Sequence, residues 1–375
     1  MKYVIINSMS RNGTSLLYQL LLGHLGLSFY PSRIEFACSL PRGWPFYNEI
    51  GKDANEYVQK MISKHFNDIG TAWNNIVHTS LHNDASFNKQ DFINDFLASN
   101  NNSNDKKQYF NSFIKSYYKI KNCNYGDITV LQEDHLFNFS PKDFVETLDE
   151  VLFIQTIRNL RDVVASRKNM LLFHNKFQGD PKLKTLNSAV VKEEATRWLW
   201  SLIASYLNHQ DYQENYLVVQ FETLKQNPIQ DMKKVAKYID IDFEDILTQE
   251  TRENKNLQNG NGLTMVDSSL KYVTKNKHKR TINSFEISLN DEELSLLKEI
   301  EEEYNLNELY NNSEDDFMQK LFLFIKNNFE KFEKNQHLSK WIEDYKNGKF
   351  VDIMDSYSLL NHGQKQAANS FKEGF

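Results

Sequence analysis

Cysteine is nearly absent from the sequence, and this excludes several kinds of covalently stabilised protein. Only Cys38 and Cys123 occur among 375 residues. Two thiols rule out a disulfide framework and a Cys-rich zinc site. His78 and His82 stand four residues apart, as metal ligands on a helix do, but no third ligand accompanies them. We therefore expect no metal.

Long apolar runs and an excess of positive charge are also missing. The apolar run at residues 1–6 is too short for a signal peptide, and polar residues interrupt the longest apolar stretch, residues 16–27. The net charge is −6, which gives no general attraction to nucleic acid. We therefore expect a cytoplasmic protein with no membrane span and no nucleic-acid partner. Any anion-binding site must be built locally.

Four short β-rich runs are present, at residues 2–7, 128–131, 151–157 and 216–221. Helical patterns alternate with them, which predicts an α/β fold with a central parallel sheet flanked by helices. We expect one domain over residues 1–310, with a helical insertion at about 30–125 that includes an aromatic-rich helix near 107–121. Residues 311–375 are expected to form a helical C-terminal appendage.

A polar loop follows the first strand directly and precedes an apolar helix. It contains Arg11, Gly13, Thr14 and Ser15. Successive backbone N–H groups and a helix N-terminus can surround an anion there, while Arg11 adds a positive charge. The loop lacks the Gly-Lys-Ser/Thr ending of a Walker A motif. A Ser/Thr-capped helix without a ligand is the alternative interpretation.

A second candidate for anion binding lies where the run at 151–157 ends. Arg158 follows that strand, and Ser166 lies one to two turns inside the next helix. Ligands of open α/β sheets bind at the carboxyl ends of the strands, where both side chains are expected. A surface salt bridge between Arg158 and Asp162 is the alternative.

Together these segments resemble two motifs of the sulfotransferase superfamily. Residues 8–15 are similar to its 5′-phosphosulfate loop, Gly-x-x-(Arg/Lys)-Ser-Gly-Thr-(Ser/Thr), with Ser8 and Asn12 at the first Gly and the Ser. Residues 158–166 are similar to its 3′-phosphate motif, Arg-Asn-Pro-x-Asp-x-x-x-Ser, with Leu160 in place of Pro. Residues 217–228 resemble a third segment, in which we expect Glu222 to be structural. The resemblance covers about residues 1–30 and 127–290.

The resemblance implies a P-loop-like fold and transfer of a sulfonate group from 3′-phosphoadenosine 5′-phosphosulfate (PAPS) to a hydroxyl or amine of a glycan or small molecule. It also implies that Arg11 stabilises the leaving phosphate. The residues expected to bind PAPS are Ser10, Arg11, Asn12, Gly13, Thr14, Ser15, Arg158 and Ser166.

A basic cluster at residues 275–280 is expected to contribute to the 3′-phosphate site. Members of the family close a late basic loop over this phosphate, so Lys279 and Arg280 are our candidates. A solvated charged loop is the alternative.

The general base is expected just after the second predicted strand. By correspondence with a Lys-Thr-His-Leu-Pro segment of cytosolic sulfotransferases, His135 is the first candidate, and imidazole titrates in a suitable range. Branches that modify glycans often use a carboxylate, which makes Glu133 the competitor. An ordinary exposed histidine is the third interpretation.

Two other functions stay open at this point. An ATP-dependent phosphotransferase would need magnesium and is disfavoured by the missing P-loop lysine. A non-catalytic nucleotide-binding protein of the same fold is compatible with the changed residues Glu133 and Asp134.

Overall fold

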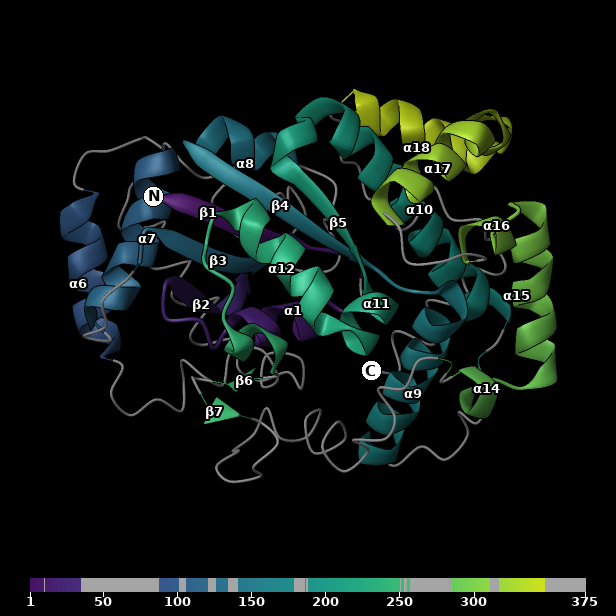
Figure 1. Ribbon diagram of the computed structural model, residues 1–375, viewed down its shortest axis with the longest axis horizontal. Coiled ribbons are helices and arrows are strands. Elements are labelled where there is room, and N and C mark those ends of the chain that lie inside the picture. The colour runs from purple at the N-terminus through teal and green to yellow at the C-terminus, as the bar shows by residue number, and fades with distance from the viewer. Residues whose placement is uncertain are drawn as a thin grey trace. The chain divides into compact units, whose positions relative to one another are not determined.

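The computed structural model describes residues 1–9, 11–34, 88–100, 106–120, 126–133, 141–178, 186, 188–249, 251–252, 255–256, 283, 285–310 and 317–347. Figure 1 shows their helices and strands. In these ranges, no helix has the length and apolar composition needed to cross a membrane.

Five strands form the central parallel sheet, in the order β2-β3-β1-β4-β5. They are β1 (Lys2–Asn7), β2 (Leu27–Ile34), β3 (Ile128–Glu133), β4 (Glu150–Ile157) and β5 (Tyr216–Gln220). β1 pairs in parallel with β3, from Lys2 opposite Ile128 to Ile6 opposite Gln132. Residues 3–7 and 151–157 are buried, as expected for strands covered on both faces. The predicted α/β class is confirmed.

β2 is the strand that the sequence pattern did not predict. It contains Pro31, which cannot donate the backbone hydrogen bond that a central strand requires. β2 lies at the edge of the sheet, and its pairing with β3 shifts in register between Phe29 and Arg33. An irregular edge strand is where proline is tolerated.

Contacts divide the chain into two compact units. The first comprises Met1–Asn7, Thr14–Ile154 and Pro228–Asn276, and the second comprises Ser8–Gly13, Gln155–Asn227 and Lys277–Phe375.

The first unit has a core rich in aromatic rings. Its described helices and short strands are α1 (Thr14–Leu21), α6 (Lys89–Ser99), α7 (Lys106–Ile120), α8 (Pro141–Thr147), α12 (Pro228–Ile239), η3 (Asp245–Thr248), β6 (Thr251–Arg252) and β7 (Lys255–Asn256). Phe113 of α7 makes edge-to-face contacts with Phe92 and Phe96 of α6, and Tyr3 packs against Phe110. The aromatic side chains of Phe110, Phe113, Tyr117 and Tyr118 in α7 are therefore part of the core.

The second unit is built around α10, which is buried along most of its length. Its described helices are α9 (Leu160–Gln178), α10 (Ser188–Tyr212), η2 (Gln213–Asn215), α11 (Phe221–Gln226), α14 (Phe285–Ser288), α15 (Asp291–Glu303), α16 (Asn307–Tyr310), α17 (Phe317–Lys334) and α18 (Gln336–Lys346). Trp200 of α10 stacks on Trp341 of α18, and Tyr206 contacts Phe329 of α17. The helices after residue 316 thus pack on α10 (Figure 1).

Candidate anion-binding site

The loop between β1 and α1 has an unusual backbone. Arg11 has φ +73° and Gly13 has φ +105°, both in the left-handed region that residues with a side chain rarely adopt. The N–H and the side-chain amide of Asn12 both donate to Met9 O, which closes the loop. α1 then begins at Thr14, so the loop ends at a helix N-terminus. Strained backbone of this kind is concentrated at functional sites.

Gly13, Phe221 and Arg158 are stacked in that order. A Cβ on Gly13 would lie 2.3 Å from Cδ2 of Phe221, so a side chain there would require the ring to move. The contact between Phe221 and Arg158 is a cation–π interaction, in which the guanidinium carbon lies 4.4 Å from the centre of the ring. Arg158 is only 7% exposed. The ring therefore positions the arginine at a fixed distance from the loop.

Four hydrogen bonds join this loop to the end of β4 and to α9. Nε and Nη2 of Arg11 donate to Oγ of Ser166, at 2.9 and 2.8 Å. The backbone N–H of Arg158 donates to Oδ1 of Asn12 at 3.1 Å, and the Ser8 hydroxyl donates to Thr156 O. The two motifs, about 150 residues apart in sequence, therefore form one site within the second unit.

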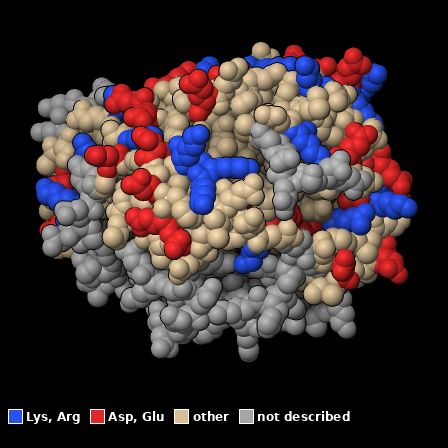
Figure 2. Space-filling view, in the orientation of Figure 1, with Lys and Arg blue, Asp and Glu red and all other residues tan. Residues whose placement is uncertain are grey.

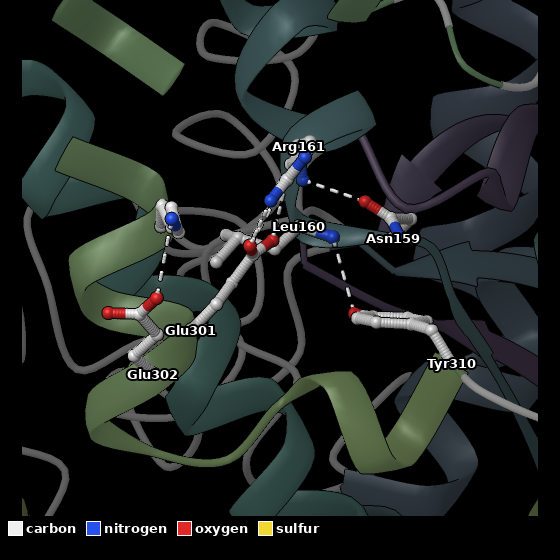
Figure 3. A network of polar contacts seen from close by, with 7 residues as sticks. Asn159, Leu160, Arg161, Glu301, Glu302 and Tyr310 are labelled. Carbon is white, nitrogen blue, oxygen red and sulfur yellow. Dashed lines mark hydrogen bonds and ion pairs between the residues drawn. The ribbon is translucent and has the colours of Figure 1, made fainter. Parts of the chain in front are cut away.

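Side chains from three helices hold the turn that follows Arg158. Trp198 Nε1 donates to Arg158 O at 2.7 Å, and Oε1 of Glu222 accepts from the N–H of Asn159 at 2.9 Å. The Tyr310 hydroxyl accepts from the N–H of Leu160 at 3.3 Å (Figure 3). The prediction that Glu222 is structural is confirmed. Tyr310 was not predicted, because no motif marks it.

Burial raises the pKa of the Glu222 carboxyl, and the hydrogen bond from Asn159 partly opposes this shift. Its Oε2 has no hydrogen-bond partner among the described residues. Ionisation of the Glu222 carboxyl therefore destabilises the fold. Its Oε1 nevertheless fixes the backbone of Asn159. Glu222 therefore supports the turn that follows Arg158.

Three basic residues of α9, Arg161, Arg167 and Lys168, pair with carboxylates. Arg161 makes a bidentate contact with Glu301 of α15, at 2.9 and 2.5 Å, which raises the pKa of the arginine (Figure 3). Lys168 lies 2.6 Å from Glu293, and both side chains are buried. Arg167 lies 3.2 Å from Glu194 of α10. These pairs fix α9, and hence Ser166, against α10 and α15.

Asp162 of α9 anchors the segment that follows the basic cluster at 275–280. Its two carboxylate oxygens accept from the backbone N–H groups of Asn283 and Phe285, at 3.0 and 3.2 Å. Asp162 is 1% exposed. The Asp162 carboxylate therefore caps the backbone at residues 283–285.

Several predicted residues are not described in full. Ser10, His135, Lys279 and Arg280 lie outside the described residues, and so do His78 and His82. Glu133 is the last residue of β3, and its side chain is not described. Thr14 is buried and Ser15 is exposed at the start of α1. In the described ranges, no three His, Cys, Asp or Glu side chains gather as metal ligands would.

The site combines groups that suit a phosphorylated ligand. It contains two guanidinium groups, a serine hydroxyl and a strained loop that ends at a helix N-terminus. Acidic and basic side chains are interspersed over the described part of the face in Figure 2. Because the net charge is −6, binding of an anion here would depend on these local groups.

Comparisons with known proteins identify the family. The sequence matches the model of the Sulfotransferase family over residues 4–245, more than half of the chain. No curated protein matches the sequence.

Three solved structures are similar to the fold at low identity. They are a sulfotransferase domain from the Synechococcus PCC 7002 olefin synthase (14% identity, 80% of this chain and 94% of that chain, TM-score 0.37), a sulfotransferase domain from the curacin biosynthetic pathway (16%, 80% and 97%, 0.40) and a sulfotransferase from Mycobacterium avium (10%, 80% and 76%, 0.41). At these TM-scores the likenesses support no argument, and the family match stands on the sequence.

Proposed function

The chain belongs to the sulfotransferase family, and on that premise we propose that it transfers a sulfonate group from PAPS to a hydroxyl or amine of a glycan or small molecule. The observation that carries the proposal is the direct bonding of the two motifs, Arg11 to Ser166 and Asn12 to Arg158. PAPS carries a phosphate on the 3′-oxygen and a phosphosulfate on the 5′-oxygen of one ribose. A single site with two adjoining anion-binding parts suits that pair of groups.

Each part of the site has its own role in this proposal. Residues 10–15 hold the 5′-phosphosulfate with backbone N–H groups, the Thr14 and Ser15 hydroxyls and the Arg11 guanidinium. Arg158 and Ser166 hold the 3′-phosphate, and the fixed position of Arg158 over Phe221 supports this role. Asn12 contributes by placing the loop, because both ends of its side-chain amide bond to the protein.

The reaction needs a cation and a base from this chain. PAPS supplies the sulfonate group, which is bound through a bridging oxygen to the 5′-phosphate. The acceptor oxygen or nitrogen forms a bond to sulfur while the bond from sulfur to the bridging oxygen breaks, leaving adenosine 3′,5′-bisphosphate. Arg11 stabilises the charge that develops on the leaving phosphate. His135 or Glu133 takes the proton that the acceptor loses.

Asp162 supports a role for the basic cluster. Its carboxylate holds Asn283, three residues after Arg280, and three residues of chain span at most about 11 Å. We infer that Lys279 and Arg280 contribute cations to the 3′-phosphate site.

The first test is a thermal-shift titration with adenosine 3′,5′-bisphosphate, set against ATP with magnesium. A ligand at 100 times its dissociation constant stabilises the native state by about 2.7 kcal/mol, enough to raise the melting midpoint. We expect a rise with the bisphosphate, and an affinity at least tenfold lower in Arg158→Ala, because charge-assisted hydrogen bonds contribute about 1.5–3 kcal/mol. The matched control is Lys298→Ala, which removes an exposed cation from α15.

Other outcomes contradict the proposal in distinct ways. A rise with ATP and magnesium alone would favour a phosphotransferase. Binding of PAPS without turnover on any acceptor class would favour a non-catalytic nucleotide-binding protein. No rise with either ligand would contradict the anion site itself.

Variants of the two candidate bases separate their roles. Of His135→Ala and Glu133→Gln, we expect the variant that removes the true base to bind the bisphosphate like wild type and to lose turnover. Wild-type turnover in both variants would remove both residues from the mechanism.

A further inference from the structure

The turn from Arg158 to Arg161 has a hydrogen-bond partner at each backbone N–H. Arg158 donates to Asn12, Asn159 to Glu222, Leu160 to Tyr310 and Arg161 to the side chain of Asn159. The first N–H groups of a helix have no partner within the helix and commonly serve as an anion site. Here protein groups occupy them at the start of α9. A phosphate at this place must therefore be held by the Arg158 side chain, whose direction depends on the turn.

Leu160 is the residue at which this turn needs an additional partner. It is the first residue of α9 and is fully buried. It stands where the resembling motif has proline, which has no N–H to satisfy and is favoured at the first helical position. With leucine, a backbone donor is buried, and leaving it without an acceptor is unfavourable. Tyr310 supplies that acceptor.

Packing within the second unit positions Tyr310. It is the last residue of α16, and its ring lies 6.3 Å from that of Trp198, the residue that binds Arg158 O. Burial and then the carboxylate of Glu222 raise the pKa of its hydroxyl, so it stays neutral. Figure 3 shows the hydroxyl directed at the backbone of Leu160. Segments 150 residues apart in sequence thus converge on one turn.

We propose that Tyr310 is a positioning residue for the 3′-phosphate site, and that it replaces, through the N–H of Leu160, the constraint that a proline at this position would supply. The predicted effect of Tyr310 on ligand affinity rests on the proposed function. Tyr310 touches no ligand in this account. It fixes the backbone that carries Arg158, so that the guanidinium is already in place when the ligand binds.

The test is a double-mutant cycle of Tyr310→Phe and Leu160→Pro, measured by calorimetric titration with adenosine 3′,5′-bisphosphate. In the wild-type background, Tyr310→Phe should weaken binding about tenfold, which corresponds to about 1.4 kcal/mol. With Leu160→Pro present, the donor no longer exists, and Tyr310→Phe should change the affinity less than about twofold. Equal losses in both backgrounds would overturn the proposal.

Tyr304→Phe is the matched control. It deletes a hydroxyl just after α15 that accepts from Asn335, and among the described residues that hydroxyl makes no hydrogen bond to the turn. We expect its bisphosphate affinity to equal that of wild type. A tenfold loss in this control would show that any tyrosine deletion near α16 disturbs the site and would overturn the specific role of Tyr310.

Amide hydrogen exchange separates failure of this inference from failure of the proposed function. If wild-type protein does not bind the bisphosphate, the proposed function is contradicted, and the exchange rate of the Leu160 amide decides the inference about the turn. An exchange rate at least tenfold faster in Tyr310→Phe supports it, and an unchanged rate overturns it.

Discussion

Replacing Gly13 by alanine tests how tightly the loop after β1 is built. The new Cβ would lie 2.3 Å from Cδ2 of Phe221, at a residue with φ +105°. The left-handed backbone costs a residue with a side chain about 1–2 kcal/mol, and overpacking a filled site costs about 1–3 kcal/mol. We therefore expect Gly13→Ala to lower the free energy of unfolding by about 2–5 kcal/mol.

The same substitution should also weaken ligand binding. The Phe221 ring must move to admit the Cβ, and the Arg158 guanidinium carbon lies 4.4 Å from the centre of that ring. A displaced ring no longer positions the arginine, so we expect a loss of bisphosphate affinity of about tenfold, the effect of one net hydrogen bond. Urea denaturation measures the first effect and calorimetric titration the second.

A control and a rescue identify the cause. In Gly26→Ala, where the backbone is not left-handed, the new Cβ would lie 3.1 Å from Cε1 of His24, a less severe contact than at Gly13, so the cost should be smaller than that of Gly13→Ala. Adding Phe221→Leu to Gly13→Ala should recover the stability lost through overpacking and leave the loss caused by the left-handed backbone. Stability of Gly13→Ala within about 0.5 kcal/mol of wild type would refute the reasoning.

Two further substitutions probe the helices that support the site. Lys168→Met leaves Glu293 charged and buried, and should lower the free energy of unfolding by about 3–5 kcal/mol in urea denaturation. Lys298→Met, which removes the exposed partner of Glu302, should change it by less than about 0.5 kcal/mol, and equal effects would contradict this account. Glu222 has a folded-state pKa raised above 4.5, so ionisation destabilises the fold. The stability of wild type relative to Glu222→Gln should therefore fall as pH rises from below 4.5 through the raised pKa, and a flat or rising difference across a pH series would contradict the assignment.

Four strands of the central sheet were predictable because burial on both faces requires continuous apolar residues. β1, β3, β4 and β5 follow from that pattern, and the loop after β1 and the Arg158 turn follow from their place at strand ends. β2 was not predictable, since an edge strand interrupted by Pro31 has no continuous pattern.

The residues that support the site were harder to predict, because their contacts bridge long stretches of sequence. Glu222 could be assigned as structural through its place in a motif. Tyr310 reaches Leu160 across 150 residues, and nothing in its local sequence marks a buried acceptor. The one available signal was Leu160 itself, since leucine in place of proline adds a buried N–H that requires a partner.

The most direct test of the central claim is sulfonate transfer from ³⁵S-labelled PAPS to a panel of glycan and small-molecule alcohols and amines. The account predicts labelled product with equal formation of adenosine 3′,5′-bisphosphate, abolished in Arg11→Ala. Loss of label from PAPS that is no faster than in buffer, with every acceptor tested, would contradict it.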